Sequence, residues 1–245
     1  YYIQSGAKAV IPGAHTGEFA MNKTELLDGW MQLVKEMTRD YGSDMVLMAA
    51  VGGANVFKDA ENAARHGYDM VLLAPTAFSG KTIDEVIILV KEIASIIPVI
   101  GFELQRAIPG SYIYSFELWE QLFEIVYGAK GASFDTYRSI VMMEAAAKSR
   151  RREVLTLLTG NDDRIVADLL GTFIFETADG ERMVKYAGGL LGHFATDTRA
   201  AVQWTHAIAE KQKSDKWIFP LTENDLAHAV NRCNMALFDA LGNFE

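Results

Sequence analysis

The chain has 245 residues, half of them hydrophobic, and a formal net charge of −9. This length and apolar content support a large core and match the size of a single α/β barrel. The acidic excess argues against a nucleic-acid binder or an anionic-membrane binder, since both need a basic surface.

Cysteine usage and apolar run length indicate the compartment. The single cysteine, Cys233, excludes an intrachain disulfide framework and a cysteine-based zinc ribbon. No apolar run approaches the roughly 20 residues needed to span a bilayer. We therefore expect a soluble, cytoplasmic protein with no membrane partner.

Short apolar runs alternate with segments of helical period along the chain, which predicts parallel β-α units. An open doubly wound sheet would need a glycine-rich phosphate loop, and GGANVF after the second run lacks that spacing. We therefore predict a (β/α)8 TIM barrel. The expected strands are Ala7–Pro12, Met45–Val51, Met70–Ala74, Val99–Glu103, Gly128–Ala132, Val154–Thr159 and Gly188–Gly192.

The two ends of the chain carry their own expectations. YYIQSGAKAV lacks an initiating methionine and has the pattern of a helix leading into a strand, so we expect the first barrel strand to precede Tyr1. GNFE at the other end has no obvious terminal pattern, so we expect further chain after Glu245.

Helix boundaries have local signals. Asn22–Glu25 and Thr82–Glu85 have capping-box spacing, and Ser115 precedes another helical segment as a candidate cap. The predicted stop signals before strands are Gly42, Gly67 and Pro98.

Two stretches depart from this alternation. Residues 163–187 are longer than a plain connection and contain a predicted turn at Thr177–Gly180, so we expect a lid or an added helix pair. After Ala209 a polar connector leads to a last helix over Asn224–Leu241. We therefore divide the chain into a barrel, 1–209, and a C-terminal helical extension packed on it, 210–245.

Lys130 lies within an expected interior strand, YGAKGASFDTY. Inside a barrel a lysine loses hydration, which lowers its pKa and frees the amine to form a Schiff base with a ketone. The alternative is a structural lysine that reaches the rim or pairs with Glu103 or Asp162. From spacing alone both interpretations remain open.

Other polar residues follow the expected strands, where a barrel carries its active face. Thr16 and the amide of Gly17 are suited to a substrate carboxylate. His15, Glu103 and His193 are candidate proton carriers, and each is also interpretable as a hydrogen-bonded structural group. The five histidines show no HxxxH or HxH spacing, so we predict no metal and no other cofactor.

Four of these strand ends resemble the dihydrodipicolinate synthase and N-acetylneuraminate lyase family, in the family's order over about residues 6–162. GAHTGEFA is similar to that family's GTTGE segment, and PVIGFELQRAIPG to its PVILYNxPxRTG segment. GAKGASFD resembles the GIKEASGD lysine strand, and LTGND resembles a strand end that reads SGDD.

The resemblance implies a barrel that assembles as a homodimer or homotetramer and acts on pyruvate or another 2-oxo acid. Lys130 would be the imine lysine, and Thr16 with Gly17 would bind the 2-oxo acid carboxylate. Pro75 matches the proline that ends the family's fourth strand. We therefore predict a lyase, an aldolase or hydro-lyase, whose substrate site also includes Phe102, Asp162 and His193.

The chain departs from the family at its proton relay. Phe102 stands where the family has a tyrosine, and Glu103 stands where it has the next asparagine. The family has a pair of tyrosines after its strand-four proline, and this chain has Thr76 and Ala77 at those positions. We expect His15 and Glu103 to rebuild the relay as catalytic residues.

Two alternatives remain at this point. One is a catalytically silent family member that binds a small carboxylate, and the other is a metal-dependent aldolase. The second substrate is not readable from the sequence, although Arg106 is a candidate contact for a second carboxylate.

Overall fold

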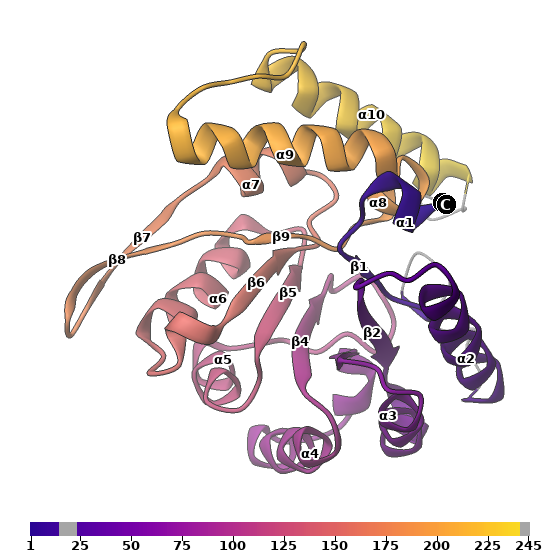
Figure 1. The fold of residues 1–245 in the computed structure, drawn as a ribbon. Coiled ribbons are helices and arrows are strands. Elements are labelled where there is room, and N and C mark those ends of the chain that lie inside the picture. The colour runs from indigo at the N-terminus through magenta and orange to yellow at the C-terminus, as the bar shows by residue number, and fades with distance from the viewer. Residues whose placement is uncertain (15–23, 241–245) are drawn as a thin grey trace.

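The structure, a computed structural model, describes residues 1–14 and 24–240. Seven parallel strands form one curved sheet in the order β1-β2-β3-β4-β5-β6-β9 (Figure 1). This is the strand arrangement of a (β/α)8 barrel, so the predicted fold class is confirmed. The strands are β1 (Ala9–Val10), β2 (Val46–Val51), β3 (Met70–Leu73), β4 (Val99–Leu104), β5 (Gly128–Ala132), β6 (Thr156–Thr159) and β9 (Gly188–Gly189).

Helices connect successive strands and cover the outer face of the sheet (Figure 1). The connecting helices are α2 (Thr24–Asp40), α3 (Val56–Arg65), α4 (Ile83–Ile96), α5 (Phe116–Phe123), α6 (Thr136–Lys148) and α7 (Ile165–Leu170). Short 3-10 turns occur at Gly53–Asn55, Pro75–Phe78 and Arg152–Val154. The remaining helices are α1 (Tyr2–Ser5), α8 (Gly192–Thr196), α9 (Thr198–Ser214) and α10 (Glu223–Ala240).

Two predicted helix caps are confirmed. The backbone N–H of Thr82 donates to Glu85 Oε2 at 2.7 Å, and the N–H of Glu85 donates back to Thr82 Oγ1 at 3.4 Å, which completes a capping box. Ser115 Oγ accepts the N–H of Leu118 at 3.2 Å at the start of α5. The first predicted capping box begins at Asn22, outside the described residues.

The sheet is buried on both faces, as a parallel sheet covered by helices must be. Its inner face packs a small apolar cluster made of Met48, Leu72, Ala74, Ile100, Phe102, Leu104 and Ala132. Its outer face packs against the helices in a larger cluster. Because side chains alternate along a strand, Phe102 points inward while Glu103 points toward the helices.

Residues 163–187 are not a helix pair, so that expectation is wrong. After α7 they form an antiparallel hairpin of β7 (Phe173–Thr177) and β8 (Gly180–Val184). The predicted turn between Thr177 and Gly180 is confirmed, and Thr177 Oγ1 donates to the carbonyl of Gly180 at 2.7 Å. Phe, Ile and Thr favour strands, and the exposure of successive residues in FIFET alternates as on a strand.

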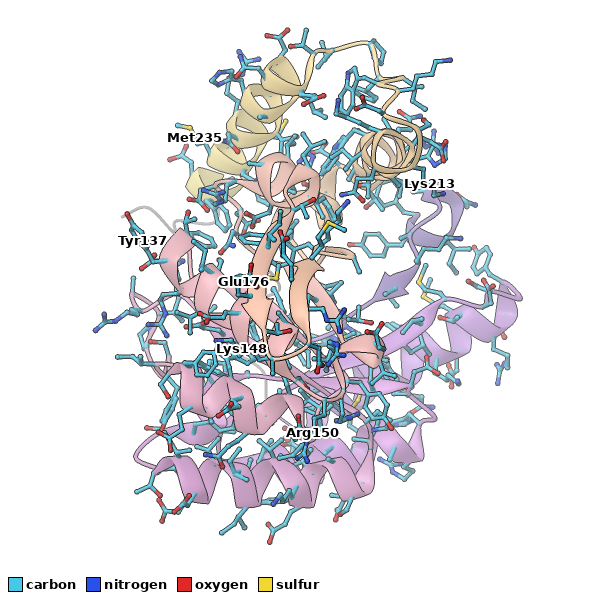
Figure 2. The ribbon with its side chains drawn as sticks, turned by 90° about the vertical axis from the view of Figure 1, so that its left-hand side faces the viewer. Tyr137, Lys148, Arg150, Glu176, Lys213 and Met235 are labelled. Atoms are coloured by element: carbon cyan, nitrogen blue, oxygen red, sulfur yellow. The ribbon has the colours of Figure 1, made fainter. Side chains whose placement is uncertain are left out.

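The hairpin also does not act as a lid over the active face. It packs on α6, and residues 182–185 line a cleft with Arg152 and Leu155, which precede β6. Figure 2 shows Glu176 on the hairpin, with Lys148 and Arg150 below it at the end of α6. The hairpin therefore contacts the end of the barrel where β6 begins, opposite the end where β6 finishes.

The C-terminal helices attach where β6 finishes. Helix α9 runs through residue 209, so the polar connector begins after Ser214, later than predicted. On α10, Asn231 Nδ2 donates to the carbonyl of Asp163 at 3.1 Å and Asn234 Nδ2 donates to the carbonyl of Asp162 at 2.9 Å. No helix in the described part of the chain is both long enough and apolar enough to cross a membrane.

Replacement of Gly128 tests the close approach of β5 to β6. A Cβ at this position would lie 1.9 Å from the carbonyl oxygen of Thr156, a backbone atom that cannot rotate away. We expect Gly128→Ala to lower the free energy of unfolding by about 3 kcal/mol in urea denaturation. Gly29→Ala, on an open face of α2, is the control and should raise it by about 0.5–1 kcal/mol. Equal effects of the two changes would contradict the packing.

Candidate active site

Lys130 is the third residue of β5 and points into the barrel. It pairs in register with Phe102 on β4 and Leu158 on β6, so all three lie on the same side of the sheet. Only 8% of Lys130 is exposed, and its Nζ lies 4.4 Å from the centre of the Phe102 ring. Together these place a buried primary amine on the inner face of the sheet.

Gly160 makes the room for that side chain. A Cβ at Gly160 would lie 2.4 Å from Lys130 Cε and 2.7 Å from Ala132 Cβ. Both distances are far below van der Waals contact, so no larger residue fits opposite the lysine without displacing it. The glycine of LTGND therefore has a steric role in this site.

Burial changes the protonation of Lys130. Loss of hydration lowers the pKa of the amine to about 8, and the carboxylate of Asp162 opposes this shift. At pH 7 a pKa of about 8 leaves roughly a tenth of the amine neutral, against fewer than one in a thousand for an ordinary lysine. The site therefore holds a usable population of the nucleophilic form.

Asp162 lies at the end of β6, in the same cavity. Burial raises its pKa to about 6, and the positive charge of Lys130 and a hydrogen bond from the Gly192 N–H act in the opposite direction. That hydrogen bond, from Gly192 N to Asp162 Oδ1, is 3.2 Å long. The carboxylate therefore titrates in a range useful for proton transfer at neutral pH.

The cavity around these two groups is small. Its volume is about 20 Å3, enough for about one water molecule. Its lining residues are Phe102, Leu104, Gln105, Lys130, Ala132, Phe134, Gly160, Asp162, Leu190, Gly192 and Phe238. Mostly apolar walls therefore surround two titratable groups in a space of about one water molecule.

Phe134, one wall of the cavity, is held in an unusual backbone conformation. Its φ of 53° lies in the left-handed region, which is costly for a bulky residue. The side-chain oxygen of Asn161 accepts the Phe134 N–H at 3.0 Å, and Asp168 accepts from Asn161 Nδ2 at 2.9 Å. A buried network therefore holds the loop after β5 against the end of β6.

Sequence reasoning missed Phe134 and Phe238. Phe238 reaches the cavity from α10, more than 100 residues away from Lys130 in the chain. A helical period predicts α10 itself but not which part of the barrel it contacts. No local signal identified either wall.

Glu103 does not join this site, and its predicted role beside Lys130 is corrected. Its carboxylate faces the helices and forms an ion pair with Arg138 of α6, whose Nε lies 2.5 Å from Oε1. Burial raises the pKa of Glu103 to about 7, and the Arg138 charge opposes the shift. The residue next to an inward-facing Phe102 must point outward, so Glu103 cannot share the cavity with Lys130.

The remaining predicted residues are placed as follows. His193 lies on α8, is 3% exposed, and is absent from the lining of the cavity. Arg106 lies in the exposed loop after β4. His15, Thr16 and Gly17 lie outside the described residues, so their roles stay predictions.

The curved parallel sheet, its outer helices and the buried lysine at its centre define a β/α-barrel protein with an amine site. No protein-family profile matches the chain, and no curated protein matches it in sequence. Solved structures of low sequence identity do match its fold.

The dihydrodipicolinate synthase from Acinetobacter baumannii, complexed with pyruvate, matches with a TM-score of 0.69 and 18% identity over 96% of this chain and 72% of that one. The 2-keto 3-deoxygluconate aldolase from Picrophilus torridus matches with a TM-score of 0.69 and 18% identity over 100% and 78% of the two chains. The N-acetylneuraminate lyase from Mycoplasma synoviae matches with a TM-score of 0.61 and 17% identity over 98% and 70%. The resemblance seen in the sequence is thus confirmed at the level of the fold.

A double-mutant cycle tests the packing of Gly160 on Lys130. We expect Gly160→Ala to lower the free energy of unfolding by about 1–3 kcal/mol, because the new methyl group overlaps the lysine side chain. In a Lys130→Ala background the loss should shrink by at least about 0.5 kcal/mol, since the overlaps with Lys130 Cε and Cγ are gone and the contact with Ala132 Cβ remains. Lys91→Ala, at an exposed lysine on α4, is the matched control and should show no coupling. Additive effects of Gly160→Ala and Lys130→Ala would contradict this geometry.

Proposed function

We propose that this chain is a Schiff-base-forming lyase, an aldolase or hydro-lyase, that acts on pyruvate or a related 2-oxo acid. The observation that carries the proposal is Lys130, a buried amine of lowered pKa inside the barrel. Solved structures of similar fold support the proposal, because one was determined with pyruvate and others are named as an aldolase and a lyase. The homodimer or homotetramer expected from the resemblance stays a prediction.

The chemistry begins with the neutral amine. Lys130 Nζ attacks the C2 carbonyl of the 2-oxo acid to form a carbinolamine, and loss of water leaves a protonated imine. The positive nitrogen then draws electrons from a bond at C3 to give an enamine. Either a C3 proton passes to a base, or the C3–C4 bond breaks and the C4 fragment leaves as an aldehyde after its hydroxyl group loses a proton. Thr16 and the amide of Gly17 are the proposed binding groups for the substrate carboxylate.

We further propose Asp162 as the group that moves the proton at C3. The phenyl ring of Phe102 has no exchangeable proton, and Glu103 points to the other side of the sheet. Among the described residues that line the cavity, Asp162 and Lys130 are the ones with ionisable side chains. His15 stays a second, predicted contributor.

A catalytically silent, carboxylate-binding protein is the second candidate. The small cavity and the loss of the relay tyrosine at Phe102 favour it. A metal-dependent aldolase receives no such support, since Glu103 is paired with Arg138 and His193 lies outside the cavity lining. Turnover separates the first two candidates.

Borohydride trapping tests the proposed nucleophile. Incubation with pyruvate and borohydride should add the mass of one reduced pyruvate to Lys130, measured by peptide mass spectrometry. Lys130→Ala should abolish the adduct, and Lys91→Ala should retain it. If neither pyruvate nor a longer 2-oxo acid gives an adduct on Lys130, the lyase proposal fails.

Turnover then distinguishes catalysis from silent binding. The panel includes cleavage of 2-keto-3-deoxygluconate and N-acetylneuraminate and the dihydrodipicolinate synthase condensation. Product formation that is lost in Lys130→Ala supports the lyase. Trapping without turnover on any of these substrates supports the silent binder.

Hydrogen–deuterium exchange at the methyl group of pyruvate tests Asp162. We expect Asp162→Asn to slow this exchange by about 10²–10⁴-fold while the borohydride adduct still forms, because an amide cannot accept the proton. The wild-type rate should rise with pH through about 6, since a base acts in its ionised form and burial raises this pKa to about 6. Nuclear magnetic resonance of the methyl signal measures both effects.

The outcomes of that experiment are separable. Asp162→Glu, which keeps a carboxylate, should recover part of the exchange. Exchange at the wild-type rate in Asp162→Asn would exclude Asp162 as the base. Loss of the adduct together with the exchange would instead assign Asp162 to substrate binding.

A further inference from the structure

His193, Asp197 and Cys233 converge at the C-terminal helices. His193 lies on α8, Asp197 lies just before α9, and Cys233 lies on α10. One potential ligand atom from each lies within 4.8 Å of the other two. Among the described residues this is the one group of three such side chains close enough to share a metal ion.

The ring of His193 is buried, and its polar contact with Asp197 is poorly aligned. The His193 side chain is 4% exposed, and neither Nδ1 nor Nε2 makes a hydrogen bond. Asp197 Oδ2 lies 3.3 Å from Nδ1 but outside hydrogen-bond geometry. Leaving a buried polar group unsatisfied costs about 1–3 kcal/mol, so such a ring needs an explanation.

We propose that His193, Asp197 and Cys233 bind a zinc ion. An imidazole nitrogen, a carboxylate oxygen and a thiolate are all zinc ligands, and the ion would satisfy one ring nitrogen of His193. Zinc bonds of about 2.0–2.3 Å place tetrahedral ligand atoms roughly 3.3–3.8 Å apart. The present separations need only a small closure, and the exposed side chains of Asp197 and Cys233 are free to make it.

The site is open to solvent on the side of Asp197 and Cys233, which are both exposed. The exposed Cys233 gives the ion a path from solvent. With three protein ligands, the fourth position belongs to water.

The site would stabilise the position of α10. Cys233 is on the same helix as Phe238, which lines the Lys130 cavity, and as Asn234, which hydrogen-bonds to the loop after β6. A metal bond from Cys233 to the α8–α9 corner would add a second attachment at this end of the molecule. The inference does not depend on the proposed lyase activity.

Metal titration tests the proposal with zinc and cobalt salts on the reduced, metal-depleted full chain. We expect one zinc ion per chain, and a rise in melting temperature of about 5–10 °C at zinc concentrations near 100 times Kd. Cobalt should bind with a thiolate-to-cobalt charge-transfer band in the near ultraviolet. Cys233→Ser should remove that band, and Asp197→Asn should weaken zinc binding at least 10-fold.

His228→Gln, at an exposed histidine on α10, is the matched control and should bind both metals as the wild type does. Both main variants change exposed side chains, so the fold is retained and circular dichroism verifies it. Failure to bind a stoichiometric zinc ion at micromolar concentrations would overturn the proposal. Binding that survives both Cys233→Ser and Asp197→Asn would place the ion elsewhere and overturn it equally.

Discussion

Burial of the Lys130 amine is the constraint around which the centre of this barrel is arranged. A fall in pKa from 10.5 to about 8 means that the site disfavours the charged form by about 3 kcal/mol. A cation–π contact with the ring of Phe102 stabilises the charged form by only about 0.5–2 kcal/mol. Residue 160 is a glycine, and a side chain at this position would overlap the lysine. Perturbed pKa values cluster at functional sites, which supports the role proposed for Lys130.

Most of the fold was predictable because its signals are local. Continuous apolar runs such as VLMAAV and MVLL predict buried parallel strands, and the Thr82–Glu85 box marks a helix start from side-chain chemistry alone. The hairpin was predictable in principle, since FIFET is rich in strand-favouring residues and leads into the turn at Thr177–Gly180. The length of this segment suggested a helix pair, but its strand-favouring composition was the better signal.

The candidate site was only partly predictable, since it depends on contacts between distant residues. Lys130 could be identified because it is a charged residue within an expected strand, and Asp162 because it follows one. Glu103 was misplaced because a strand buried on both faces hides which residues point inward. Its partner Arg138 is 35 residues away on a helix, and nothing in either segment indicates the pair. Phe238 is still more remote and reaches the cavity only through the packing of α10.

Asp162 contributes both to the Lys130 cavity and to the attachment of helix α10. Its side chain shares the cavity with Lys130, while its backbone carbonyl accepts a hydrogen bond from Asn234 of α10 at 2.9 Å. The cavity of about 20 Å3 has room for about one water molecule, so the proposed substrate would need a larger one. Asn161 holds the backbone of Phe134, whereas Phe238 enters the cavity lining from α10. Any shift of α10 that opens the cavity therefore acts on the loop that carries the Asp162 carboxylate.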